Sequence, residues 1–254
     1  MRNKTIIYET NLDRFRFHDV NREIDDTISK REIREMAEDM KVNGFRFTEP
    51  IVVTKNFWII DGQHRVEAAK AAGVGIYYVI DESVANSPKA IFEAFLIYNR
   101  HKKVVRKNDF VHGYSAMGNE NFQILQQFGE KYPMFSMTER MLLLRNSGTK
   151  NPSKESFQNG KFEIGDVKKA EKWANYLLEL KPLFEKGYNK SNFVRAMLTI
   201  LEKKKQFKFD EFLHKVKLRP SSIYLCGDRR SYCEMIEDIY NFKRRESEKL
   251  NLRF

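Results

Sequence analysis

The segment from Trp58 to Gly73 constrains this chain most, because an apolar stretch passes through Gly62 directly into a basic, alanine-rich helix. A glycine lets the backbone approach a ligand closely, and the first amides of a helix have no partners within it. Arg65 brings a fork of donors to the same point. The segment therefore predicts a site for an anion such as phosphate.

Residues 61–65 read Asp-Gly-Gln-His-Arg. A phosphate at this turn would accept hydrogen bonds from backbone amides, a bidentate contact from Arg65 and a further donor from His64. A structural interpretation competes with this one: Asp61 caps the helix, Gly62 only makes the turn, and Arg65 pairs with a carboxylate such as Glu67 or Glu93. On the residues alone, the structural interpretation is favoured.

The Pro-Ile-Val-Val strand at 50–53, the segment 61–65 and the alanine helix together resemble the ParB/sulfiredoxin nucleotide-binding module. In chromosome-segregation members this module is a CTP switch on DNA, and in sulfiredoxins it is an ATP site with a cysteine beside the histidine. Gln63 stands at that cysteine position, and Cys226 and Cys233 are far away in sequence. The resemblance thus implies a site for CTP or ATP that includes Gly62, Gln63, His64 and Arg65, without sulfiredoxin chemistry.

Two further parts of the family pattern have counterparts in this chain. Arg22 stands where such modules present an arginine near the nucleotide. A polar box that reads Glu-Asn-x-x-Arg in segregation proteins here begins with Tyr98, followed by Asn99 and, at the arginine position, Lys102. The resemblance therefore adds Arg22, Asn99 and Lys102 to the predicted cofactor site. Loss of the acid disfavours Mg2+, which prefers charged oxygen ligands.

The pattern along the chain predicts an α+β fold: an N-terminal mixed sheet with helices at 1–105, followed by an all-helical domain at 106–254. Strands are expected at 12–17, 50–54, 57–60 and 75–80. Helices are expected around Ile33 to Met40, ending near Asn43-Gly44, over 64–72, and along the Ile91 to Tyr98 stripe. Beyond about residue 108 the sequence shows only helical periodicity.

The net charge of +11 is uneven, with 15 Lys and Arg against 16 Asp and Glu in residues 1–100 but 31 against 19 in residues 101–254. Such an excess attracts polyanions, and DNA is the expected partner. The connector at 101–107 concentrates cations around two valines, so Lys103, Arg106 and Lys107 are predicted to contact the DNA backbone. An ordinary basic linker is the competing interpretation.

A helix-turn-helix formed by 121–128 and 137–144 fits poorly, since the intervening segment is too long and Met141 to Leu144 resemble core residues. The five histidines have no zinc-ligand spacing, and no metal site is expected. Two cysteines, no membrane-spanning segment and no signal-peptide core predict a cytoplasmic location.

The resemblance and the basic charge together predict a ParB-like DNA-binding protein whose phosphate or nucleotide site regulates its binding to DNA. The ending 239–254 resembles the tails of family members from phages and mobile elements. The resemblance also implies a homodimer, although no coiled-coil heptad is present. Two alternatives stay open: a metal-dependent nuclease or nucleotide hydrolase using Asp61 and Asp81, and an interaction protein with a degenerate pocket.

Overall fold

The structure is a computed structural model that describes residues 5–21, 24, 27–99, 105–149 and 152–254. Its internal contacts divide the chain into two compact units, which we call the N-terminal unit (1–123) and the C-terminal unit (124–254). Each unit has its own buried core. The boundary expected at 105/106 falls inside the N-terminal unit, and the assignment of functions to the two parts stays a prediction.

The N-terminal unit is built on a four-stranded mixed sheet with the strand order β1-β4-β2-β3. The strands are β1 (Ile7–Glu9), β2 (Ile51–Val53), β3 (Ile59–Asp61) and β4 (Ile76–Ile80). β4 pairs antiparallel with β1 and parallel with β2, and β2 pairs antiparallel with β3. The predicted α+β class, with the sheet in the N-terminal part, is confirmed.

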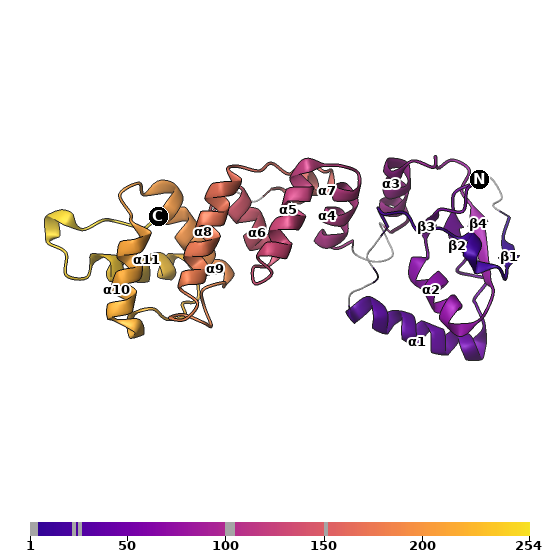
Figure 1. Cartoon of the computed structure of the whole chain (residues 1–254), viewed down its shortest axis with the longest axis horizontal. Helices are drawn as coiled ribbons and strands as arrows, with labels where there is room; N and C mark the ends of the chain where they lie inside the picture. Colours follow the sequence, from indigo (N-terminus) through magenta and orange to yellow (C-terminus); the bar gives the residue numbers. More distant parts are fainter. Residues whose placement is uncertain (1–4, 22–23, 25–26, 100–104, 150–151) are drawn as a thin grey trace. The chain divides into compact units, whose positions relative to one another are not determined.

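Helices cover both faces of this sheet (Figure 1). α1 (Thr27–Asn43) and α2 (Gln63–Ala72) lie on one side, and α3 (Pro88–Asn99) lies on the other. Successive residues of β2 face opposite sides of the sheet, so Ile51 and Val53 join the core beneath α1 and α2, whereas Val52 joins the core beneath α3. α1 ends where Gly44 takes a positive φ of 69°, as the Asn-Gly signal predicts.

The strand predicted at 12–17 is wrong. Asn11 accepts a hydrogen bond from the amide of Asp13 and begins a short 3-10 turn, η1 (Leu12–Arg14), which breaks the extended backbone. Only Arg16 forms an isolated bridge, with Trp58. The first strand of the described chain is β1, whose three residues are too few to show a period.

All described strands precede residue 81, and the rest of the described chain is helical, as predicted. The helices of this part are α4 (Lys107–Ala116), α5 (Glu120–Lys131), α6 (Met137–Leu144), α7 (Lys154–Gln158), α8 (Val167–Glu179), α9 (Ser191–Lys203), α10 (Phe209–Leu218) and α11 (Arg229–Asn241), with short 3-10 turns η2 (Pro220–Ser222) and η3 (Glu246–Glu248). Within the described ranges, none of the helices combines the length and apolar character needed to cross a bilayer.

The segment after α11 is fastened to α10. Arg244 donates two hydrogen bonds to the carboxylate of Glu211, and this contact holds the pKa of Glu211 below its usual value. Lys215 donates to the backbone carbonyls of Tyr240 and Phe242. Arg244 after α11 and Lys215 on α10 therefore both serve the fold of the C-terminal unit.

The four residues from Met141 to Leu144 are all buried, so α6 packs in the core, as predicted. We expect Leu142→Ala to lower the free energy of unfolding by about 2–5 kcal/mol, because it leaves a cavity in a close-packed region. Leu225→Ala, at an exposed leucine of the same unit, should change it by less than about 0.5 kcal/mol. Urea unfolding measures both, and equal effects would contradict the packing of α6.

Candidate functional site

The junction between β3 and α2 is a tight turn made by Gly62. This residue is the N-cap of α2, has a positive φ of 101° and, as a glycine, has no side chain that could cap the helix. The first amides of α2 are therefore not screened by an N-cap side chain. The part of the structural interpretation in which Asp61 caps the helix is wrong.

Glycine is required at this position for two reasons. The left-handed backbone is strained for any residue with a side chain. In addition, a Cβ atom on Gly62 would lie 2.5 Å from Cδ1 of Ile51 and 3.0 Å from Nη2 of Arg65. The turn is thus packed closely against β2 on one side and against its own helix on the other.

The turn opens onto a cavity of about 640 Å3, which we call the turn cavity. Its size is that of a small-molecule site. Gly62, Gln63, His64 and Arg65 line it together with Asn99, so the structure brings together five of the residues predicted for the cofactor site. Arg22 and Lys102 lie outside the described residues.

Arg65 is held by partners within the chain. Its Nη2 donates to Oδ2 of Asp61 at 3.1 Å, and its Nη1 donates to the carbonyl oxygen of Glu49 at 2.8 Å. The structural interpretation expected Arg65 to pair with Glu67 or Glu93. The structure shows an ion pair, but its acids are Asp61 and Glu49. Through these contacts Arg65 fastens the turn to the residues just before β2. Its side chain also lines the turn cavity, so the ion pair does not close the cavity.

The charges around the turn cavity are mixed. Nδ1 of His64 lies 3.3 Å from a carboxylate oxygen of Glu32 on α1. Glu49 also lines the cavity, and its carboxylate lies 3.6 Å from Arg65. A bare anion would meet two carboxylates here besides Asp61, so amides and neutral groups must supply much of any phosphate binding.

The polar box at the end of α3 forms local contacts. Nδ2 of Asn99 donates to the carbonyl of Phe95 one turn earlier, at 2.9 Å. The hydroxyl of Tyr98 donates to Oδ2 of Asp81 at 2.6 Å, and Oδ1 of Asp81 accepts from Ser83. The proposed metal pair of Asp61 and Asp81 is thus engaged with Arg65, Tyr98 and Ser83.

Two of the three predicted DNA-contact residues lie at the start of α4. Arg106 is its N-cap and Lys107 its first residue, and both are exposed. Cations are unfavourable at this positive end of a helix, and Asp109 offsets them by accepting from the amide of Arg106 at 2.8 Å. Lys103 lies outside the described residues.

Sequence reasoning missed several walls of the turn cavity. Asn21 is buried and donates to the carbonyl of Ile59 at 3.0 Å, which ties the segment after η1 to β3. Glu32 and Met36 also line the cavity, and they lie one turn apart on α1. Their i, i+4 spacing predicts that they share one face of the helix, but not that this face borders a cavity. Phe95 belongs to the predicted stripe of α3, but nothing in the stripe shows which of its members border a cavity.

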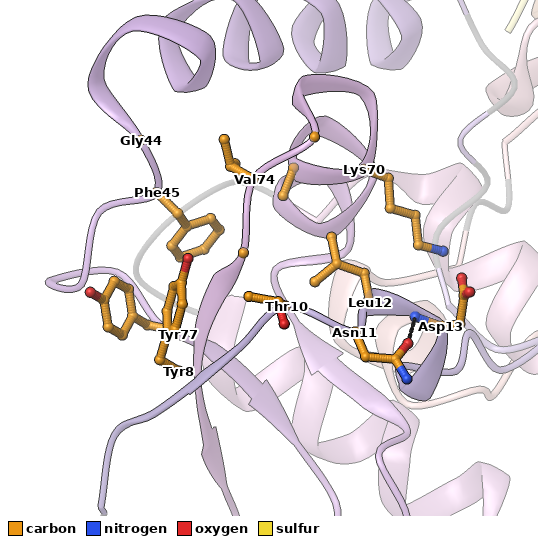
Figure 2. A pocket seen from close by; sticks show the side chains of 13 residues that line it. Tyr8, Thr10, Asn11, Leu12, Asp13, Gly44, Phe45, Lys70, Val74 and Tyr77 are labelled. Carbon is orange, nitrogen blue, oxygen red and sulfur yellow. Dashed lines mark hydrogen bonds between the residues drawn. The ribbon is translucent and has the colours of Figure 1, made fainter.

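A second hollow of about 900 Å3 lies elsewhere in the N-terminal unit. Figure 2 shows the rings of Tyr8, Phe45 and Tyr77 gathered at one end and Asp13 and Lys70 at the other. It contains none of the predicted site residues.

Among the residues that the structure describes, no three His, Cys, Asp or Glu side chains gather in a group that could bind a metal ion. No protein-family model matches this chain, and no curated protein matches it. The site must therefore be judged on its geometry.

The ion pair of Asp61 and Arg65 should stabilise the turn, because both side chains are largely buried, at 11% and 18% exposure. In a double-mutant cycle of Asp61→Ala and Arg65→Ala, we expect a coupling free energy of about 1 kcal/mol or more. The exposed pair Lys89 and Glu93 on α3 is the matched control, with a coupling below about 0.5 kcal/mol. Urea unfolding of the four proteins of each cycle gives both values, and equal couplings would contradict the bracing role.

Proposed function

We propose that the chain is a DNA-binding protein of the ParB/sulfiredoxin type, with a nucleotide bound in the turn cavity. One observation carries the proposal: a helix that begins at a left-handed glycine, without a side-chain cap, faces a cavity large enough for a nucleotide. The parallel pairing of β2 and β4 around α2 is compatible with such a module.

The walls of the turn cavity suit the two ends of a nucleotide. Phosphate would lie at the amides of Gln63 and His64, where the helix dipole favours negative charge. Met36, Pro50 and Phe95 supply apolar surface for a base. CTP and ATP are the ligands that the resemblance implies.

Arg65 has a different role in this proposal from the one that the sequence suggested. Two of its five N–H donors are committed to Asp61 and Glu49. It therefore holds the turn in place, and a ligand phosphate would take up remaining donors of the same guanidinium. Because Glu32 and Glu49 oppose a bare anion, binding should be measured both with and without Mg2+.

DNA binding is assigned to the basic part of the chain. The C-terminal unit holds 27 Lys and Arg against 17 Asp and Glu, whereas the N-terminal unit holds 19 against 18. The C-terminal unit therefore carries almost the whole net charge. In the N-terminal unit, Arg106 and Lys107 are exposed at the start of α4. Such an excess favours a polyanionic partner.

Gln63→Glu tests the nucleotide site with little risk to the fold. An acid in the first turn of α2 favours the helix dipole, but it places a negative charge where the phosphate would lie. We expect the affinity for CTP or ATP, measured by isothermal titration calorimetry, to fall about tenfold or more, which corresponds to ~1.4 kcal/mol.

Gln127→Glu makes the same chemical change on exposed surface of α5 and should leave nucleotide affinity unchanged. The proposal fails if the wild-type protein gives no binding heat with CTP, ATP or GTP in either buffer. It fails equally if Gln63→Glu and Gln127→Glu bind nucleotide alike.

Replacing Arg106 and Lys107 by glutamine tests the DNA contact. Each phosphate contact removed should reduce the slope of log K against log[salt] by about 0.9. Fluorescence anisotropy with a labelled duplex over a salt series measures the slope. Lys55→Gln, at an exposed cation of the β2–β3 turn, is the control, and an equal slope in all three proteins would place the DNA contact elsewhere.

A further inference from the structure

β1 is an edge strand whose outer side has no strand neighbour within the described part of the chain. The opposite edge differs, because the backbone of Arg16 pairs with Phe57 and Ile59 beside β3. An open edge presents a row of backbone donors and acceptors to another chain.

Within residues 5–8, the sequence of this edge lacks the charges and prolines that usually protect an edge strand. Residues 5–8 read Thr-Ile-Ile-Tyr, without charge or proline, and β-branched and aromatic residues favour strand pairing. These four residues lie between Lys4 and Glu9 in the sequence. The carboxylate of Glu9 is turned back to accept from the amides of Thr10 and Asn11. Nothing charged therefore projects from 5–8 to repel an incoming strand.

Exposed apolar side chains gather at the same place. Ile6 and Tyr8 are 47% and 55% exposed, and Phe47 is 61% exposed. The rings of Tyr8 and Phe47 flank Tyr77 at centroid distances of 4.9 and 6.4 Å. Figure 2 shows Tyr8 and Tyr77 side by side. This aromatic patch is continuous with the open strand.

The strand is complementary to itself. In an antiparallel pair centred on Ile7, Ile6 of one copy lies opposite Tyr8 of the other, so every facing pair from 6 to 8 is apolar. Thr5 then faces Glu9, which brings no like charges together. A two-fold axis through Ile7 closes the contact, so the assembly stops at two copies.

Charge also favours a second copy over a charged partner. The N-terminal unit holds 19 Lys and Arg against 18 Asp and Glu, so two such units meet without net repulsion. The short strand pair is smaller than a standard interface of about 800 Å2 per partner, and the aromatic patch supplies further apolar area.

We propose that two copies of this chain dimerise through antiparallel pairing of β1 with β1, centred on Ile7, to form one continuous sheet across the two N-terminal units. This interface does not depend on the proposed nucleotide site, and its test uses no nucleotide or DNA.

Cysteine cross-linking tests the register. In a Cys226→Ser background, Ile7→Cys should form a disulfide between copies under mild oxidation, because directly opposed residues lie within disulfide range. Cys233 is buried and stays in place. Ile97→Cys, exposed on α3, is the control and should remain monomeric on a non-reducing gel. Absence of the Ile7→Cys dimer, or equal cross-linking of both variants, overturns the proposal.

Light scattering after size exclusion tests the assembly itself. The wild-type protein should have the mass of two chains, and Ile6→Lys and Tyr8→Lys should each have the mass of one, with helical circular dichroism unchanged. Ile97→Lys should keep the wild-type mass. A monomeric wild type, or a dimer that survives both β1 substitutions, overturns the proposal.

Discussion

The N-terminal unit depends on the way the chain leaves β3 at Gly62. The left-handed glycine lets α2 begin at once, with Ile51 packed against the turn and Arg65 reaching back to Asp61 and Glu49. These contacts join β2, β3 and α2 at one point, so a side chain at position 62 would disturb all three elements. Because only glycine adopts this backbone conformation without strain, a substitution at position 62 is unfavourable even before its contacts are considered.

The same contacts explain why a cavity lies at the turn. Arg65 is held by Asp61 and Glu49, and the first residues of α2 line the cavity beside its guanidinium. Asn21 and Asn99 complete the wall from segments distant in sequence, Asn21 by bonding Ile59 and Asn99 by bonding Phe95. The site therefore combines a rigid base with walls contributed by α1 and α3. Such pre-organisation favours ligand binding, because little ordering is left to be done when the ligand arrives.

The sequence predicts those parts of the unit whose signals are local. The Asn43-Gly44 stop of α1, the hairpin of β2 and β3, and the glycine before α2 depend on neighbouring residues, and the structure contains all three. Two kinds of feature could not be predicted from the sequence. β1 is too short to show a period, and the alternation at 12–17 imitated a strand that the Asn11 cap converts into a turn. The Glu49 partner of Arg65 is distant in sequence, so only the fold reveals that contact.

The division of charge gives the two units different relations to other molecules. A nearly neutral N-terminal unit accepts contacts that a strongly basic one would oppose, including a small ligand beside Glu32 and a second copy along β1. In the C-terminal unit, Lys215 and Arg244 are committed to carbonyls and to Glu211, so the excess charge must act through the remaining exposed cations. If the chain dimerises through β1, each dimer carries two basic units, and the avidity gained depends on whether one DNA molecule reaches both. On the proposal that the basic unit binds DNA, a dimer held through β1 would bind with two such units, and the gain in affinity would come from their linkage rather than from a new contact.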